Sequence, residues 1–293
     1  MSKLLTVFTP TYNRGYCLGQ VYESLLRQSN KNFIWLIIDD GSTDNTRELV
    51  ENWKSDGHLE IRYIYQKNQG MHGAHNTAYS NIETELNVCI DSDDFMPDTA
   101  VDIILMNTDG LDKAIFAGII ALDADKNGQI IGTKIPDNLH RVKLSDLYLK
   151  HGVKGDKKVV LFTDVAKSVP PYPLFPGEKF VPLDYKYLLI NQCLYFKAVN
   201  EVTCIVEYQL DGSTLNIFRQ YRDNPKGFSF SRISRINYGS TFTEKIKNSI
   251  HLVSSTIFSK NFGDLFKTNF TPLIILSIPF GLILNLYIRI KTT

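Results

Sequence analysis

The sequence predicts an α/β fold with a mostly parallel central sheet, because strand-like and helix-like segments alternate through its first hundred residues. These segments are, in chain order, 4–9, 18–28, 33–38, 43–54, 61–65, 74–82 and 86–90. Alternation of this kind is typical of strand–helix–strand units, whose strands run parallel. A second observation supports the same fold: a polar cluster follows each of the four strand-like runs.

The four polar clusters indicate a shared ligand site. They occupy residues 9–13, 39–42, 68–70 and 91–94. In open α/β sheets, ligands bind at the carboxyl ends of the strands. Clusters at four such ends are hard to attribute to loop chemistry alone, so we expect them to line one binding site.

The fourth cluster carries the most specific chemistry. Asp91, Asp93 and Asp94 directly follow an apolar run, and three carboxylates placed together repel one another unless a cation or several donors hold them. Hard oxygen ligands suit Mg²⁺ or Mn²⁺, which leave coordination positions for phosphates. The sequence thus predicts a divalent metal meeting a phosphorylated ligand. The alternative is a polar loop that only caps the helix expected to begin near Pro97.

Composition limits the other possibilities. The 293 residues are 43% hydrophobic and 22% charged, as in an ordinary globular protein. From residue 226 onward the chain has nine Lys or Arg residues and two acidic residues. Residues 1–225 therefore carry a net negative charge. The basic residues are scattered without interleaved stacking aromatics, which argues against nucleic acid. Four cysteines without paired spacing, and a strand that starts near Leu4 without room for a signal peptide, predict a cytoplasmic protein.

The segments after residue 109 are less regular. Strand-like runs at 114–122 and 129–132 flank an acidic turn, which we interpret as a hairpin. The proline-rich stretch 169–177 must be an extended connection, because proline removes backbone donors and fixes φ. We expect this stretch to drape over the site.

The C-terminal segment changes character. Apolar residues recur at helical spacing between 242 and 257, which predicts an amphipathic helix. The mostly apolar run 273–288 has sixteen residues, fewer than the roughly 20 that span a bilayer. We expect an interfacial or re-entrant membrane anchor through residues 242–291, with Arg289 and Lys291 meeting anionic headgroups. Packing in a homodimer and a true membrane span are the alternatives.

The motifs of the first hundred residues occur in a specific order. They are TPTYNR at 9–14, SLLRQ at 24–28, IIDDGSTDNT at 37–46, NQG at 68–70, AHN at 74–76 and DSDD at 91–94. In this order they resemble the family 2 glycosyltransferases of the GT-A fold, especially bacterial enzymes of capsule and surface-polysaccharide assembly. Looser matches follow at 154–157, 176–180, 207–208 and 211–213.

The resemblance implies a Rossmann-like GT-A domain and a metal-dependent reaction. A sugar would pass from a nucleoside-diphosphate sugar, with UDP favoured, to a hydroxyl of a saccharide or lipid-linked acceptor, with inversion. It also implies a nucleotide-sugar half at 1–110, an acceptor half at 111–235 and membrane-associating helices at 236–293. The expected location is the inner face of a bacterial cell membrane, with Mn²⁺ or Mg²⁺ as the cofactor.

Roles for individual residues follow from the resemblance. Asp93 is the expected metal ligand, and Asp91 would reach the metal or the ribose. Asp40, assisted by Asp39, would accept a hydrogen bond from the imide N–H of uracil or thymine. The other expected nucleotide or donor contacts are Thr9, Pro10, Thr11, Tyr12, Asn13, Lys67, Asn68, Gly70, His75, Asn76, Ser92 and Asp94. Lys67 and His72 could supply positive charge, and His75 stands where many relatives have arginine.

The catalytic base is the main departure from the family pattern. Inversion needs a carboxylate that takes the acceptor's proton. Many relatives use the Asp of a Glu-Asp pair, but the comparable place here reads Glu178-Lys179. We expect Glu178 to be the base, with Asp184 as the runner-up. The structural alternative is that Glu178 only pairs with a nearby lysine.

Two other functions compete with glycosyl transfer. A nucleotidyltransferase on a similar sheet would normally carry a glycine-rich basic loop after the first strand, and this sequence lacks it. A glycosyltransferase-like subunit that binds nucleotide sugars without catalysis is conceivable because the Glu-Asp pair is missing. Metal-dependent hydrolysis of a nucleotide sugar would separate an active transferase from such a binding subunit.

Overall fold

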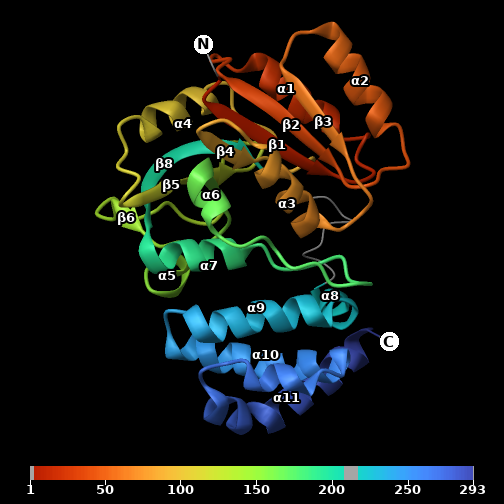
Figure 1. Cartoon of the computed structure of the whole chain (residues 1–293). Coiled ribbons are helices and arrows are strands. Elements are labelled where there is room, and N and C mark those ends of the chain that lie inside the picture. The colour runs from red at the N-terminus through yellow and green to blue at the C-terminus, as the bar shows by residue number, and fades with distance from the viewer. Residues whose placement is uncertain (1–2, 208–216, 293) are drawn as a thin grey trace. The chain divides into compact units, whose positions relative to one another are not determined.

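The computed structural model describes residues 3–207 and 217–292, which form two compact units (Figure 1). Among the described residues, the first unit contains 3–69, 73–171 and 193–207. The second contains 70–72, 172–192 and 217–292. This division follows contacts, whereas the expected three-part division followed functional roles, so the latter stays a prediction.

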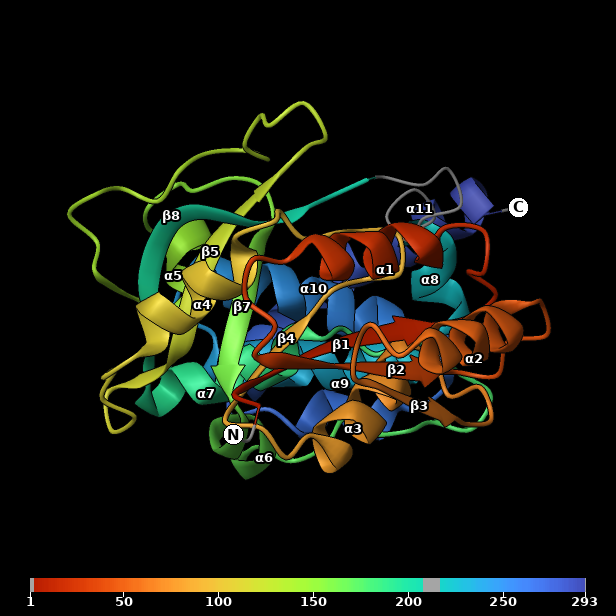
Figure 2. The same ribbon diagram turned by 90° about the horizontal axis from the view of Figure 1, so that it is seen from above.

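The first unit is built on an eight-stranded sheet in the order β3-β2-β1-β4-β7-β5-β8-β6. The strands are β1 Leu5–Thr11, β2 Phe33–Asp39, β3 Ile61–Tyr65, β4 Leu86–Cys89, β5 Phe116–Ala124, β6 Arg141–Val142, β7 Lys157–Phe162 and β8 Tyr195–Ile205. Strands β1 to β4 are mutually parallel and run side by side (Figure 2), and β5 is parallel to β8. β7 runs antiparallel to both β4 and β5. The predicted α/β class is confirmed, with antiparallel pairs in the second half of the sheet.

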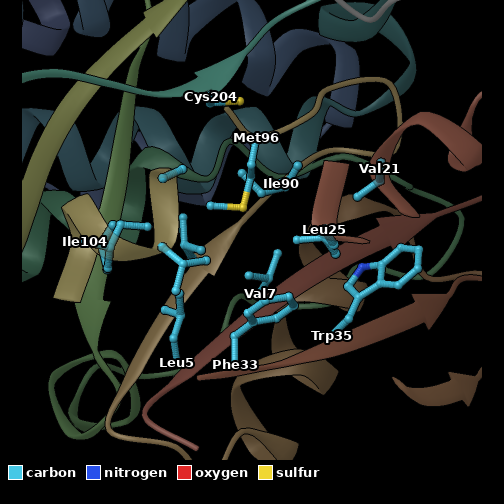
Figure 3. Close-up of a cluster of buried hydrophobic side chains, with 14 of the residues drawn as sticks. Leu5, Val7, Val21, Leu25, Phe33, Trp35, Ile90, Met96, Ile104 and Cys204 are labelled. Carbon is cyan, nitrogen blue, oxygen red and sulfur yellow. The ribbon is translucent and has the colours of Figure 1, made fainter. Parts of the chain in front are cut away.

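Helices cover both faces of this sheet (Figure 1). The helices of the first unit are α1 Leu18–Arg27, α2 Thr46–Asp56, α3 Met71–Asn81 (its start belongs to the second unit), α4 Ala100–Thr108, α5 Leu144–Leu149 and α6 Thr163–Ser168. Residues of α1, α2 and α4 share one apolar core with the inner strands. In the close-up of this core, Val21 and Leu25 of α1 lie over Val7 of β1 and Trp35 of β2 (Figure 3). β1 and β2 are buried along their whole length, as expected for central parallel strands.

The predicted hairpin after residue 114 is only partly formed as strands. β5 pairs with its neighbours over Phe116–Ala124, and the 129–132 segment contributes an isolated bridge between Ala124 and Ile130. The turn itself is stabilised locally, because the Asp125 carboxylate accepts hydrogen bonds from the N–H groups of Asn127 and Gln129. Asp125 therefore has a structural role in this turn.

The second unit is helical. It contains α7 Asp184–Cys193, α8 Ile217–Asp223, α9 Pro225–Tyr238, α10 Phe242–Ser259, a 3₁₀ helix Phe262–Phe266 and α11 Thr271–Thr292. α10 packs against both α9 and α11, and its core contains Ile236, Leu252, Val253 and Ile274. The close approach of α11 requires Gly281, because an added Cβ there would lie 2.4 Å from the Cβ of Val253.

α11 is longer than the sixteen-residue apolar run from which it was expected. Polar residues at both ends extend the helix to 22 residues, which corresponds to about 33 Å. Pro279 lies inside the helix without ending it. Among the described residues, α11 is the one helix that is long and apolar enough to cross a membrane by length and composition.

Candidate active site

Hydrogen bonds join the two loops that follow β1 and β2. The Asn13 backbone N–H donates to the Ser42 hydroxyl (2.9 Å), and the Asn13 side-chain oxygen accepts from the Thr43 N–H (2.7 Å). Asn13 has a φ of 52°, a left-handed conformation that asparagine tolerates better than most residues. The predicted contact residue Asn13 therefore holds two strand ends together at this edge of the sheet.

Asp39 ends β2 and is fully buried. One carboxylate oxygen accepts from the Ser42 N–H (2.7 Å), and the other accepts from the Tyr63 hydroxyl (2.6 Å). Burial, and then this bond to a carboxylate, raise the pKa of Tyr63 above its ordinary value, so the phenol keeps its proton. Asp39 thus shapes the turn that positions the next residue.

Asp40 is the second carboxylate of this pair, and it is held in one orientation. Its Oδ1 accepts from the Gln66 side-chain amide (2.7 Å) and from the Gln69 N–H (2.8 Å). Gln66 is itself fixed, because its side-chain oxygen accepts from the Thr77 hydroxyl on α3 (2.5 Å). A carboxylate anchored in this way is suited to recognise one ligand edge without paying further side-chain entropy.

The acidic loop after β4 alternates between partly exposed and buried residues. Asp91 and Asp93 are half-buried, whereas Ser92 and Asp94 are buried. The loop is also attached to α1, because the Gln20 side-chain amide donates to the Asp93 carbonyl (2.5 Å). Two of the three carboxylates therefore remain partly accessible on a fixed backbone.

Asp94 is bound inside the protein, beside a lysine. The Lys158 amine of β7 lies 3.7 Å from Asp94 Oδ2, and the two side chains are 12% and 7% exposed. The Cys204 thiol (3.6 Å) and the Glu207 N–H (3.3 Å) also donate to this carboxylate. Burial, together with two neighbouring carboxylates, raises the pKa of Asp94 to about 7 although Lys158 opposes the change.

Sequence reasoning did not identify Lys158 as a site residue. Its positive charge partly offsets the repulsion expected among the three carboxylates of the acidic loop. Burial disfavours its charge, but Cys204, Asp123 and the acidic loop hold the pKa of Lys158 above its ordinary value. The ammonium group therefore stays charged beside the loop. The signal in the sequence was the pair Lys157-Lys158 at the start of an apolar strand.

The two other carboxylates of the acidic loop, those of Asp91 and Asp93, are of a kind that can bind a divalent metal. In the described part of the chain, no group of three or more His, Cys, Asp or Glu side chains converges as a complete metal cage. Mg²⁺ and Mn²⁺ do not need one, because they commonly bind one or two carboxylates and complete their shell with water and substrate phosphates. The carboxylates of Asp91 and Asp93, both half-buried, have hard oxygen atoms of the kind that such a shell uses.

The end of β1 contributes both core and site residues. Thr9 is fully buried, and its hydroxyl accepts from the Trp35 indole N–H (3.0 Å); Pro10 is buried as well. The Thr11 hydroxyl is buried and has no hydrogen-bond partner among the described residues. Tyr12 is 49% exposed. Thr9 therefore supports the core, and Thr11 and Tyr12 remain available to a ligand.

Four predicted contacts lie around the start of α3. Lys67 is exposed, whereas Asn68 and Asn76 are half-buried. Gly70 has a φ of 83°, and an added Cβ would lie 1.9 Å from the Lys179 carbonyl oxygen. Only glycine fits this position, for both its backbone conformation and its space.

The two histidines of this region are packed side chains. His75 is 2% exposed, stands edge-on to the Phe8 ring at 5.1 Å between centroids, and lies 3.7 Å from the Cys89 thiol. Burial, and then Lys179, lower the pKa of His72 to about 4, so His72 is neutral at pH 7. It cannot supply the positive charge that the sequence suggested.

Glu178 belongs to the second unit and caps a helix there. Its two carboxylate oxygens accept from the backbone N–H groups of Lys226 (3.0 Å) and Gly227 (2.8 Å). These N–H groups belong to the first turn of α9, where a negative charge is favoured by the helix dipole. Among the described residues, main-chain N–H groups engage both oxygens of Glu178, and the lysine pairing named as the alternative to a base role is not formed.

Asp184, the second candidate base, is the first residue of α7. Its Oδ2 forms an ion pair with Arg235 of α9 (2.5 Å), and its side chain is 29% exposed. The other oxygen has no hydrogen-bond partner among the residues that the structure describes. Asp184 thus keeps one available acceptor, unlike Glu178. Of the looser sequence matches, residues 208 and 211–213 lie outside the described residues.

Comparison of the sequence with known families matches the model of glycosyl transferase family 2 over residues 6–164, more than half of the chain. An uncharacterized glycosyltransferase of Rickettsia felis is 40% identical over 101 residues, 34% of this chain and 16% of that protein. Glycosyltransferase GlyG of Streptococcus pneumoniae is 29% identical over 119 residues, 40% of this chain and 39% of that protein. Chondroitin synthase of Escherichia coli is 34% identical over 102 residues, 35% of this chain and 15% of that protein. The match spans well under half the length of these relatives.

Solved structures share the fold over most of the chain. TarS of S. aureus (residues 1–349, in complex with UDP-GlcNAc) has a TM-score of 0.59 at 17% identity, covering 94% of this chain and 79% of that one. The mannosyltransferase PcManGT of Pyrobaculum calidifontis, in complex with GDP-Man and Mn²⁺, has a TM-score of 0.55 at 15% identity, covering 97% and 87%. At these identities the likeness is one of fold, and it agrees with the predicted GT-A architecture.

Proposed function

Because the chain belongs to glycosyl transferase family 2, we propose that it moves a sugar from a nucleoside-diphosphate sugar to a hydroxyl of a saccharide or lipid-linked acceptor. A UDP-sugar is the favoured donor, and the anomeric carbon is inverted. The observation that carries this proposal is the acidic loop after β4. There Asp91 and Asp93 stay partly exposed while Asp94 is anchored to Lys158.

Asp93, with Asp91, would hold the divalent metal, Mn²⁺ or Mg²⁺. Such an ion, when bound, neutralises the negative charge that develops on a departing diphosphate. The protein's part is to present two carboxylates on a backbone fixed by Gln20. Asp94 acts behind them, because Lys158 holds it inside the protein.

Asp40 is the residue proposed to recognise the base. Its carboxylate is held by two hydrogen bonds, which supports a role as a fixed acceptor for the imide N–H of uracil. The Thr11 hydroxyl, buried without a described partner, is the second candidate donor or acceptor for the nucleotide. Thr9, Asn13 and His75 support the site from behind, because their side chains bond or pack within the protein.

Asp184 is proposed as the catalytic base, in preference to Glu178. A base must accept the acceptor's proton while the acceptor oxygen attacks. Both oxygens of Glu178 already accept main-chain hydrogen bonds that would have to break. Asp184 has one oxygen held by Arg235 and one without a described partner, which suits proton transfer.

The proposed function is tested by ligand-dependent stability and turnover. We expect a UDP-sugar with Mn²⁺ to raise the melting temperature of the protein, because a ligand that binds only the folded state stabilises it. A GDP-sugar, whose base lacks the imide N–H between two carbonyls, should raise it less. A UDP-sugar should also be hydrolysed slowly without acceptor. Binding without hydrolysis or transfer would indicate a nucleotide-sugar-binding subunit, and absence of binding to every nucleotide sugar would refute the proposal.

Attachment to the inner face of a bacterial membrane is the proposed setting. The buried face of α11 is narrow and packs on α10; it contains Ile274, Ser277, Gly281, Asn285 and Ile288. The remaining surface of the helix exposes large apolar side chains at Ile275, Leu276, Ile278, Phe280, Leu282, Ile283, Leu286, Tyr287 and Ile290. An exposed apolar face of this extent is typical of a surface that meets lipid or another protein.

The packing of α11 favours lying in the membrane surface over spanning it. One face of the helix is bound to α10, and the Asn285 side chain donates to the Ser254 carbonyl (3.2 Å). A spanning helix would have to carry this polar contact, and α10 with it, into hydrocarbon. Basic residues such as Arg289 and Lys291 follow the apolar face, as in helices that bind anionic bilayers. An acceptor carried on a membrane lipid, for surface-polysaccharide synthesis, fits this setting.

Charge placed on the exposed face of α11 should abolish membrane binding. Leu276 and Ile283 lie seven residues apart on one face and are 71% and 67% exposed. We expect the Leu276→Glu/Ile283→Glu variant to stay with the soluble fraction when floated with anionic vesicles, while the unmodified protein floats. The control is Met106→Glu/Leu149→Glu, which adds the same charge at exposed apolar positions of the first unit. Equal flotation of all three proteins would contradict the lipid-surface proposal.

A further inference from the structure

Arg235 joins two carboxylates that come from different helices of the second unit. Its Nη2 lies 2.5 Å from Asp184 Oδ2 at the start of α7, and its Nη1 lies 2.8 Å from Glu244 Oε1 in α10. Arg235 is 32% exposed and Asp184 is 29% exposed, whereas Glu244 is only 4% exposed. The chain Asp184–Arg235–Glu244 therefore runs from a partly open carboxylate to a buried one.

Glu244 stands three residues after the N-cap of α10, where a glutamate side chain commonly bonds back to the N-cap backbone. Thr241 is the N-cap of α10, and its hydroxyl accepts from the Glu244 N–H (3.2 Å). In a complete capping box, the glutamate side chain at this position returns to the N–H of the N-cap residue. Here Glu244 Oε1 is instead 2.8 Å from Arg235, and Oε2 has no partner among the described residues.

The packing around Glu244 leaves room for its contact with Arg235, because a glycine stands beside it. Gly239 has backbone angles that any residue can adopt, so its backbone conformation does not require glycine. An added Cβ at Gly239 would lie 2.7 Å from Glu244 Oε2 and 2.3 Å from the Arg235 carbonyl oxygen. A larger residue would push Glu244 away from Arg235. The absence of a side chain at position 239 thus makes room for the contact.

A buried carboxylate oxygen without a hydrogen-bond partner is costly, because the desolvation of that oxygen is not compensated. The arrangement therefore calls for a physical reason. Arginine has a planar fork that can bind two carboxylates at once and fix its own orientation, which a lysine cannot do. Glu244 fixes one side of that fork, and the other side then meets Asp184 in a defined geometry.

We infer that Arg235 and Glu244 are positioning residues that orient Asp184 for proton transfer. This inference rests on the proposed function, in which Asp184 is the base. With Oδ2 held by Arg235, Oδ1 accepts the proton as the O–H bond of the acceptor breaks. The acceptor oxygen forms the new bond to the anomeric carbon, and the bond from that carbon to the diphosphate oxygen breaks, with its electron pair leaving on the diphosphate.

The competing explanation is that the three residues only tie α7, α9 and α10 together. A purely structural ion-pair chain would change stability when broken and leave the turnover of the folded enzyme unchanged. A positioning role predicts a loss in kcat with donor binding preserved, because misplacement of a reacting group by about 1 Å costs on the order of 10²-fold. The two explanations therefore differ in kinetics and not only in stability.

The experiment is a double-variant cycle on the full-length chain with Mn²⁺ and a UDP-sugar. We expect Arg235→Met to lower kcat on the order of 10²-fold, with the melting-temperature shift caused by UDP and Mn²⁺ unchanged. Arg235→Lys should recover only part of kcat, since it keeps the charge but cannot bridge both carboxylates. Asp184→Asn/Arg235→Met should be no slower than Asp184→Asn alone, because residues that act through one group are not additive.

The matched control is Lys267→Met, which also removes a cation from a buried carboxylate of the same unit, Asp264, at 2.7 Å. Its kcat should equal that of the unmodified protein. An Arg235→Met variant with full kcat, or losses that multiply in the double variant, would overturn the positioning role while leaving the proposed function intact. Full kcat in Asp184→Asn would instead show that the assigned base is wrong, and the inference would fail with it.

Discussion

Replacement of Asp93 by alanine should reduce sugar transfer by about 10³-fold or more, the scale of several kcal/mol that a metal ion contributes to charge stabilisation. The same variant should lose the Mn²⁺-dependent part of UDP binding. Its fold should persist, because the backbone of this loop is held by Gln20 and by the neighbouring Asp94, which stays paired with Lys158. Turnover and the melting-temperature shift with UDP, each measured with and without Mn²⁺, check both expectations.

The control for this prediction is Asp98→Ala, which removes an exposed carboxylate a few residues away. The Asp98 side chain forms a surface ion pair with Arg27, with side chains 60% and 50% exposed, and such pairs contribute little. Its variant should keep both turnover and metal response. If Asp93→Ala retained the Mn²⁺ response of the unmodified protein, the metal would have to bind elsewhere and the assignment of Asp93 would be lost.

The order of elements in the first unit could be predicted because it depends on patterns that the sequence displays directly. Apolar runs of strand length separated by helical segments define parallel units, and the structure places the first four strands as expected. The antiparallel strand β7 could not be predicted in this way. It is inserted between β4 and β5 by pairing over long sequence separation, which leaves no local signature.

The roles of individual side chains were harder to predict than their location. Thr9 and His75 belong to motifs of the expected site, yet one bonds to the Trp35 indole and the other packs on Phe8. Along a buried strand, successive side chains point to opposite faces, and helices cover both faces here. A motif of the expected site therefore includes residues that bond or pack within the protein, and the structure shows which these are.

The helical unit illustrates a second limit. An amphipathic helix was expected from residue 242 and is present as α10. The apolar segment after it was expected to be too short to span a bilayer, but α11 has 22 residues because hydrophilic ends such as Thr271 and Thr292 continue the helix. Hydropathy marks the apolar part of a helix and not its hydrogen-bonded length. The face that packs on α10 likewise includes a close approach at Gly281, which hydropathy does not mark.

The catalytic base gives the second large expected effect. Asp184→Asn should lower kcat by roughly 10²-fold or more, the usual scale for loss of a general base. The affinity for UDP with Mn²⁺ should stay nearly unchanged, because the residue acts on the acceptor's proton and not on the nucleotide. Steady-state kinetics with varied donor and acceptor, together with UDP titration followed by melting temperature, check this expectation.

Glu178→Gln is the matched comparison, since it also replaces one carboxylate by an amide. The new NH₂ group would face an N–H group of Lys226 or Gly227 in the first turn of α9, so one of the two capping hydrogen bonds would be lost. We expect a loss of about 1 kcal/mol in the free energy of unfolding, as for other N-terminal caps, with kcat changed only a few-fold.

If Glu178→Gln instead lost kcat without losing stability, and Asp184→Asn kept its kcat, the two roles would be exchanged. If both variants turned over normally, the proton would have to pass to another group. The comparison is decisive because each carboxylate is engaged by a different kind of partner: main-chain donors hold both oxygens of Glu178, whereas an arginine holds one oxygen of Asp184.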